Sequence, residues 1–572
     1  MNSKERFELI LNDLGESKGY ASQIHSEIQL WREEVYGEYA VNLDAKKKRY
    51  KSGIKLKDLE RVIESSIPSI IEPFINDNDI VKAEVNNPDK VVKSKITEHL
   101  LNKQYREMKN REGKIEQLAH DLMVDGSVIV KTTLSGSIPT FEIINPFEII
   151  VDPSAKRQED IRFVIQRRVV SINDILSNPS WFGEHTLDEL EELMPKTSTE
   201  YDDPDTQIFG RSDSFNFTDR KRQLVEVFEY NGMLPNESGE LEPRLVIFSE
   251  DANMILNDMP SPYPAKWKGI PFDFEVYRRK SNSIFGLSIA SLISDYQKVR
   301  TGFMRAIMEN ANSANHNQKW SKKGALDVVN KRKMMNGEDF ETNVDPQVAI
   351  VQGEFNQIPG SVFEIMELMK QEEEEITGIT RMGAGVNENA LKSGVTATAV
   401  QAFNDTASRR LTFVVKRLSS LLSKVFKRFA DLNSLYLEPV MMGNMIVDNT
   451  MICSENIMVV APSAVEKQKQ IQNTLFMMQQ LQMLGSMLPM SIYLDLMTSL
   501  ADNLDMPVLK QQLVQIKQNM NSPEAQQQQM NQQALQEQMT IAELNKTNME
   551  AQKLEAEAVQ KSIETQLKAY GL

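Results

Sequence analysis

GLSIASLISDYQKVRTGFMRAIMENANSANHN, residues 286–317, and SVFEIMELMKQEEEEITGITRMGAGVNENALKSGVTATAV, residues 361–400, are the two stretches that decide the fold. The first predicts a helix, because its apolar residues recur at three- and four-residue spacing. The second predicts an acidic helix that ends at Gly378, then a loop, then an Ala-rich helix that begins near Val395 and continues to Tyr436. Between them lies a basic insert that contains the strand-like run QVAIVQ. We therefore expect two helices that flank an insert, followed by a long helix.

The first predicted helix has two chemically different faces. Its apolar positions are Leu287, Ile289, Leu292, Ile293, Tyr296, Val299, Phe303, Met304 and Ile307. The opposite, polar face carries Asp295, Lys298, Arg300 and Arg305. In the second helix, the run Glu372–Glu375 is expected to be a solvated face, because adjacent helical positions point about 100° apart and do not converge on a metal ion.

Towards the N-terminus the sequence predicts a unit of helices and strands. Residues 1–123 read as amphipathic helices, the third of which is expected to kink or stop at Pro68 and Pro73. Residues 80–87, IVKAEVNN, alternate like a short strand. After Gly126 the period changes to two, in runs rich in Val and Ile that predict a small sheet packed against the helices. The polar segment 195–222 is expected to be an exposed loop.

From Ala461 onwards the composition shifts to Gln and Met. The segment after Pro523 lacks Pro and Gly until Gly571, so it predicts a helix of about 45 residues and roughly 70 Å. Its apolar heptad positions are interrupted by Lys546, Lys553 and Gln560, which makes a poor seam for an independent coiled coil. A partly disordered polar tail is the alternative.

The length and charge of the chain limit what it can do. Its 572 residues imply more than one domain. The net charge of -16 argues against tight binding of DNA, which needs clustered Lys and Arg, but is compatible with a wall along which DNA slides. The one cysteine, Cys453, lies in an apolar run and is expected to be a buried core residue. The N-terminal stretch lacks the apolar core of a signal peptide, and no run of 18 apolar residues occurs, so we expect no membrane association.

Searches for catalytic patterns lead us to expect that the protein is not an enzyme. The nearest match to a phosphate-binding loop, GAGVNENALKS at residues 383–393, has Leu391 where a Gly must precede the Lys, and no buried strand before it. The five histidines are scattered without HExxH spacing or a Cys partner, and no GxSxG motif occurs. We therefore predict no catalytic residues, no cofactor and no metal ion.

Two segments remain candidates for functional sites. The insert carries six basic residues in an otherwise acidic chain: Lys319, Lys322, Lys323, Lys331, Arg332 and Lys333. They form either a solvated charge run or a contact surface for acidic partners. The loop after Gly378 contains the glycines that mobility requires, together with Asn387, Asn389 and Ser393; the alternative is an ordinary connection between helices.

The chain resembles the portal proteins of tailed bacteriophages, especially those of short-tailed phages. The pattern GxS…Q…R…N in the first quoted stretch and TG(I/V)xxxxxG…TAT in the second carry the resemblance. Three further segments match the family in the same order along the chain: VIESSIPSIIEPFI at 62–75, DLMVDGSVIVKT at 121–132 and NPFEIIVDPSAKRQEDIRFVIQRRVVSINDIL at 145–176. Each of these matches is loose by itself, but their common order over roughly residues 55–436 makes the resemblance specific.

The resemblance implies an α+β, mostly helical portal fold with wing, stem, clip, crown and C-terminal helical barrel. The implied boundaries are 1–285 for the wing, 286–314 for the first stem helix, 315–360 for the clip, 361–378 for the second stem helix, 379–394 for the tunnel loop, 395–465 for the long wing helix and returning strands, 466–520 for the crown, and 521–572 for the barrel or tail.

The implied function is a ring, usually a dodecamer in this family, at one capsid vertex of the virion. Through its channel, double-stranded DNA is packaged, retained and ejected. The implied partners are a separate terminase ATPase, tail adaptors, and capsid and scaffolding proteins, with assembly in the bacterial cytoplasm. The resemblance places Arg381, Asn387, Asn389, Lys392 and Ser393 on the tunnel loop and the six basic residues on the clip. Within a ring, Leu292, Tyr296, Val299 and Phe303 become candidates for the subunit interface. The alternative is a helical scaffolding or structural assembly protein without a channel.

Overall fold

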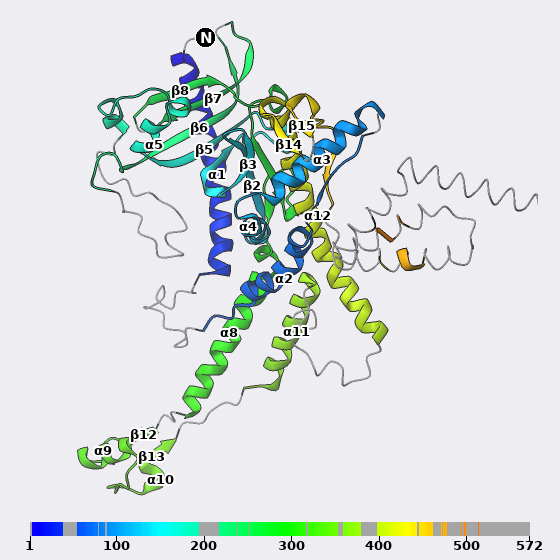
Figure 1. Cartoon of the computed structure of the whole chain (residues 1–572). Helices are drawn as coiled ribbons and strands as arrows, with labels where there is room; N and C mark the ends of the chain where they lie inside the picture. Colours follow the sequence, from blue (N-terminus) through cyan, green and yellow to red (C-terminus); the bar gives the residue numbers. More distant parts are fainter. Residues whose placement is uncertain are drawn as a thin grey trace, which may run out of the picture. The chain divides into compact units, whose positions relative to one another are not determined.

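The structure is a computed structural model in which the chain forms two units, Met1–Ser463 and Ala464–Leu572 (Figure 1). It describes residues 3–37, 54–77, 79–85, 88–193, 217–236, 238–250, 252–315, 319–352, 358–378, 397–442 and 445–460 of the first unit. In the second unit it describes residues 471, 473–476, 494, 497–498 and 513, of which Leu494 and Leu513 are buried with Met497 against them. The expected loop at 195–222, the tunnel loop and the C-terminal barrel lie wholly or mostly outside the described residues.

Four helices open the first unit: α1 (Ser3–Val35), α2 (Asp58–Ile75), α3 (Val91–Arg106) and α4 (Arg111–Val124). The helix α2 contains both Pro68 and Pro73, so it does not stop at Pro68, and it ends two residues after Pro73. A proline inside a helix costs about 3 kcal/mol, and the buried apolar face of α2 offsets this. The helices α3 and α4 are separate, because Asn110 between them adopts a left-handed conformation with φ 50°.

The strands form two main sheets rather than the single small sheet that was predicted. One has the order β3-β2-β9, and the other the order β4-β5-β6-β7-β8. The turn at Asn145–Pro146 leads the chain from one sheet into the other. The strand before the turn, β3, therefore belongs to the three-stranded sheet, and the strand after it, β4, belongs to the five-stranded sheet. Neighbouring strands are antiparallel in both sheets, which confirms the predicted α+β class. The strands are β2 (Ser127–Ser135), β3 (Ile138–Ile144), β4 (Ile149–Val151), β5 (Phe163–Ser171), β6 (Leu224–Pro235), β7 (Leu241–Ser249), β8 (Met254–Pro260) and β9 (Phe272–Val276).

Short elements connect and edge these sheets. They are η1 (Pro88–Lys90), η2 (Pro146–Glu148), η3 (Gln158–Asp160), α5 (Ile172–Ser177), α6 (Pro179–Phe182), η4 (Glu189–Leu193) and η5 (Ala265–Trp267). The strand pair β10 (Arg278–Arg279) and β11 (Gly286–Leu287) follows β9. The helix expected from Gly286 therefore starts later, at Ala290. A Cβ on Gly286 would lie 2.5 Å from the carbonyl oxygen of Gly126, so this glycine permits a close backbone approach that a helix would not make.

The second half of the first unit consists of helices and short strands. The helices are α8 (Ala290–Asn315), α9 (Val328–Asn336), α10 (Pro346–Ala349), α11 (Gly360–Thr377), α12 (Ala397–Tyr436) and the 3₁₀ turn η7 (Asn449–Met451). The strands are β12 (Lys319–Ser321), β13 (Ile350–Gln352), β14 (Val440–Met442), β15 (Met445–Val447) and β16 (Ile457–Val459). As predicted, α11 ends at Gly378, which is left-handed with φ 73°, and Cys453 is buried and free.

The largest core gathers residues from both ends of the first unit. The helix α12 packs on the three-stranded sheet, on α2 and on β16. The strand β16 pairs with β1 (Val81–Ala83), the short strand predicted in residues 80–87. Buried side chains of α2, α4, β2, α8 and α12 meet in one hydrophobic cluster. This cluster is the base from which α8 and α11 extend.

A buried polar cluster joins the two sheets. The Nζ atom of Lys131 on β2 donates to Oε1 of Gln166 on β5 at 2.9 Å and to Glu229 on β6. Asn231 donates to the same Glu229 carboxylate at 3.0 Å. Burial lowers the pKa of Lys131. Burial also opposes ionisation of Glu229, but Lys131 and Arg168 outweigh it and lower the pKa of that carboxyl. The two sheets are thus held together by an ion pair as well as by apolar packing.

The side chain of His25 connects α1 to the turn between the sheets and predicts a pH effect. Its Nε2 lies 3.0 Å from the carbonyl oxygen of Pro146 and 3.3 Å from that of Ile149, so the neutral ring donates there. Burial lowers the pKa of His25 below its usual 6.5. As the pH falls below about 6.5, His25 is protonated in the unfolded chain but stays neutral in the folded chain. The free energy of unfolding therefore falls with pH, and this fall ends below the folded-state pKa of His25.

The expected result is a loss of stability between pH 7.5 and 5.5 that is smaller in His25→Gln than in the natural chain. Tryptophan fluorescence during urea unfolding measures it, since Trp31, Trp181, Trp267 and Trp320 are the four tryptophans and all lie in the first unit. The comparison between variants cancels the opposite contribution of His120, whose pKa is raised by its bond to Asp121. An equal loss in both chains would contradict the assignment.

Candidate functional site

The helices α8 and α11 pack against each other, with the insert between them in sequence. Figure 1 shows α8 leading from the large core to the β12–β13 pair. That pair is antiparallel, with Trp320 opposite Val351, so the first and last parts of the insert meet. Two antiparallel helices that end in a small independent module can present that module to a partner.

The insert has a mixed structure. Lys331, Arg332 and Lys333, which were expected in a strand-forming segment, lie on α9 between the N-cap Asp327 and the left-handed Gly337. These three side chains are exposed, as are Lys322 and Lys323. The backbone of Lys319 pairs with Gln352. In the described part of the chain these five exposed cations form no ion pair, so their charge is available to a partner.

A buried ionic cluster fixes α11 to the core. The Nη1 atom of Arg300 on α8 lies 2.6 Å from Oδ2 of Asp58 and 2.9 Å from Oε2 of Glu373. These residues are 8%, 5% and 2% exposed. Arg61 adds a second cation, 3.1 Å from Asp58 and 4.0 Å from Glu373. Burial, followed by the nearby Asp58 carboxylate, raises the pKa of Glu373.

Two predictions fail at this cluster. Arg300 was expected on a polar helix face and Glu373 on a solvated one, yet both are buried. Hydropathy patterns assign charges to the surface because an unpaired charge is costly to bury. The pairing partner of Arg300 is more than 70 residues away in sequence, so periodicity does not reveal it.

The four candidate interface residues of α8 have different surroundings. Leu292 is half-buried and packs against the large core of its own chain. Tyr296 hydrogen-bonds to Glu372 of α11. Phe303 is half-buried, and Val299 is 42% exposed. Three exposed apolar residues of α11 were missed at the sequence level, although their pattern was visible: Phe363, Ile365 and Leu368.

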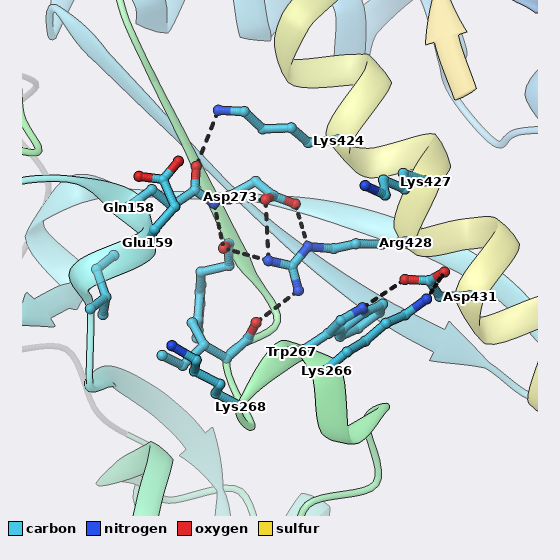
Figure 2. Close-up of a pocket in the computed structure, with 13 residues that line it drawn as sticks. Gln158, Glu159, Lys266, Trp267, Lys268, Asp273, Lys424, Lys427, Arg428 and Asp431 are labelled. Carbon is cyan, nitrogen blue, oxygen red and sulfur yellow. Dashed lines mark hydrogen bonds and ion pairs between the residues drawn. The ribbon is translucent and has the colours of Figure 1, made fainter. Parts of the chain in front are cut away.

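A pocket of about 460 Å³ lies beside the C-terminal half of α12. Figure 2 shows Lys424, Lys427, Arg428 and Asp431 projecting from α12 towards residues of η3 and η5. The apolar part of the lining comes from Ile161, Trp267, Ile270 and Phe272. No local sequence pattern indicated this pocket, because its walls come from three separate parts of the chain.

Most charged groups of this pocket are paired. Arg428 donates to the carbonyl oxygens of Ile270 and Phe272 at 2.7 and 3.0 Å, and its Nε lies 2.6 Å from Asp273. Asp431 accepts from Trp267 at 2.9 Å and from Lys266. In the described part of the chain, Lys268 and Lys427 have no such partner, and both are exposed.

The described residues offer no arrangement typical of a metalloenzyme or a membrane protein. No three His, Cys, Asp or Glu side chains among them come together as ligands of a metal ion. No helix among them has the length and apolar character needed to cross a membrane. The tunnel-loop candidates Arg381, Asn387, Asn389, Lys392 and Ser393 lie outside the described residues.

Comparison with protein families agrees with the order of elements described above. The family model of the phage SU10 portal protein matches residues 8–138 and 133–543. The match includes the helices and sheets of the first unit, the pair α8 and α11, the insert and the long helix α12. Because it spans most of the sequence, the chain belongs to the phage SU10 portal protein family and is a portal protein of a tailed bacteriophage.

Proposed function

We propose that the protein assembles into a closed ring, a dodecamer, at one capsid vertex, and that double-stranded DNA passes through its central channel during packaging, retention and ejection. The family match is the observation that carries this proposal. The family implies a structural protein of the virion rather than an enzyme, and an oligomeric ring that contacts capsid and tail proteins. The ATPase that drives DNA inwards is then a separate terminase.

Within this proposal the chain is divided as the resemblance to portal proteins implies. Residues 1–285 form the wing, residues 286–314 and 361–378 the stem, and residues 315–360 the clip. The tunnel loop at 379–394 and the long wing helix with its returning strands at 395–465 follow. Residues 466–520 form the crown, and residues 521–572 the barrel or tail. The packing of α8 on α11 and the β12–β13 pair support the stem and clip assignments.

In this proposal the insert docks the terminase during packaging and the tail adaptors afterwards. The exposed cations of α9, together with Lys322 and Lys323, provide the charge for contact with acidic partner surfaces. Arg381 and Lys392 of the tunnel loop are the residues proposed to lie nearest the DNA phosphates, with Asn387, Asn389 and Ser393 beside them.

Apolar residues on the stem helices supply the contact between neighbouring subunits. Val299 on α8 and Phe363 and Leu368 on α11 are 42%, 54% and 55% exposed in the single chain. Rings bury two different surfaces at each contact, so apolar residues on both stem helices are expected to become covered. Tyr296 and Phe303 extend the same surface, whereas Leu292 contributes mainly within its own chain.

Electron microscopy of the purified chain, classified without imposed symmetry, tests the proposal. We expect closed rings with a central channel wide enough for duplex DNA, and the class averages will give the number of subunits. Monomers, filaments or solid bundles under all assembly conditions would reject the ring. That outcome would favour a scaffolding or structural assembly protein without a channel.

A further inference from the structure

The pocket beside α12 carries positive charge that its own chain leaves unpaired. Its carboxylates Asp273 and Asp431 are held by Arg428, Lys266 and Trp267. Among the described residues, Lys268 and Lys427 line it without an ion pair, opposed by one exposed carboxylate, Glu159. In a chain of net charge -16, such a local excess of positive charge is unusual.

The backbone at Lys268 is strained in a way that supports a binding role. Lys268 has φ 54°, in the left-handed region, directly before Gly269 with φ 80°. A left-handed conformation is unfavourable for a residue with a Cβ. Such strain persists only where the surrounding structure imposes it, and it concentrates at ligand clamps. Here it accompanies an exposed ammonium group on the pocket lining.

A second, larger depression extends this surface. It shares Gln158, Glu159 and Lys424 with the first pocket. Its lining adds Lys156, Arg157 and Arg279, which are exposed and without an ion pair among the described residues, together with one exposed carboxylate, Asp160. The two depressions therefore form one basic surface with partly apolar walls.

These features fit carboxylate side chains of a protein better than a nucleic acid. The pocket is concave and about 460 Å³ in volume, room for a few side chains and too small to admit a duplex. Trp267, Ile161 and Ile270 offer apolar contacts that a phosphate backbone does not use. The negative charge of the whole chain also disfavours the approach of DNA at long range.

The same chain presents an acidic surface on a different part of the first unit. Glu184, Asp188 and Glu189 are exposed around η4. Buried Leu190 and Leu193 anchor this turn in a core that lies under the five-stranded sheet. The ring of His185 lies 2.9 Å from the carbonyl oxygens of Phe182 and Leu256, which holds the turn against β8.

The two surfaces belong to separate faces of the unit. The acidic turn rests on the hydrophobic cluster built from α5, α6, β6 and β8, whereas Ile161, Ile270 and Phe272 of the pocket belong to another cluster. The helix α5 contacts β5 of the five-stranded sheet, whereas α12 packs on β2, β3 and β9 of the other sheet. A head-to-tail ring requires complementary patches on two different surfaces of one subunit.

We propose that the basic pocket of one subunit receives the acidic turn around Asp188 of a second copy of this chain. This inference rests on the proposed ring. The carboxylates of Glu184 and Asp188 pair with Lys268 and Lys427, and the apolar pocket wall excludes water from the contact. The pairing adds a contact in the wing to the apolar contact of the stem helices, and its opposite charges fix the direction in which subunits follow one another.

Charge reversal on each side tests the pairing. The pocket variant is Lys268→Glu with Lys427→Glu, and the turn variant is Glu184→Lys with Asp188→Lys. Analytical ultracentrifugation measures the concentration at which half of the chain is assembled. We expect each variant alone to need at least tenfold more protein than the natural chain. The control Lys82→Glu with Lys109→Glu makes the same change in net charge on exposed residues that line neither depression, and it is expected to assemble normally.

Mixing the two variants gives the sharper result. Equal amounts should restore assembly to within about twofold, in rings where the variants alternate, which native mass spectrometry detects as equal subunit numbers. Normal assembly of the pocket variant, or no recovery on mixing, would overturn the inference. Normal rings that have lost binding of an acidic capsid protein or of DNA would overturn it too and assign the pocket to that partner. If the natural chain formed no rings, the proposed function itself would fail.

Discussion

Replacing Arg300 with Met is expected to detach α11 from the core of the first unit. The substitution leaves the carboxylates of Asp58 and Glu373 buried without their main cation. Breaking a buried ion pair by removing one partner costs about 3–5 kcal/mol. Glu373 and Thr377 are the buried residues of α11, so the ionic cluster holds the most deeply buried part of this helix. We therefore expect local opening of α11 rather than loss of the whole fold.

Hydrogen–deuterium exchange of peptides from residues 360–377 measures this effect. A loss of about 3 kcal/mol corresponds to exchange that is roughly 100-fold faster, since each 1.4 kcal/mol is a factor of ten. Lys298→Met, on the same helix, is the matched control. Its pair with Glu34 is 46% exposed on the lysine side, and exposed pairs contribute at most about 1 kcal/mol. Unchanged exchange in Arg300→Met would show that α11 is held by other contacts.

Replacing Lys131 with Met is expected to destabilise the contact between the two sheets by a similar amount. Glu229 would remain buried, with only Asn231 and the more distant Arg168, 3.5 Å away, to compensate for its charge. The cost is again about 3–5 kcal/mol. Unlike the Arg300 change, it acts on the sheets themselves, so tryptophan fluorescence should report earlier urea unfolding of the first unit.

A double variant separates the lost charge pair from simple loss of packing. Lys131→Met with Glu229→Gln removes both charges and keeps an acceptor for Asn231, so we expect it to recover at least half of the lost stability. Lys18→Met, which breaks the exposed pair with Glu250, is the control and should change stability by less than about 1 kcal/mol. A double variant as unstable as Lys131→Met would argue that the volume of the lysine matters more than its charge.

The sequence predicted elements better than it predicted their partners. Helices α8, α11 and α12 and most strands follow from apolar spacing, which is a local property. The division into two sheets does not, because Asn145–Pro146 reads as a turn whichever sheet the next strand joins. The strand β8 was missed, since MILNDMP does not alternate and its partner β7 determines its conformation.

The candidate sites could be predicted only where their residues are adjacent in sequence. The basic insert was found because its charges are adjacent in sequence. The pocket beside α12 was not, because Lys268 and Lys427 are about 160 residues apart and neither stands out locally. Arg300 and Glu373 were each assigned to the surface, since a buried ion pair is recognisable only when both partners are placed together.

The pairing of β1 with β16 means that the large core is completed only late in translation. The large core contains Val62 and Val124 near one end of the first unit and Phe429 and Val459 near the other. Translation at about 5–20 residues per second needs on the order of half a minute to pass from Val124 to Val459. During that time the apolar faces of α2 and α4 lack their packing partner α12, because α12 has not yet been released from the ribosome. Nascent chains therefore expose a surface that must be shielded, and copies translated side by side on one messenger RNA are at risk of exchanging their late elements.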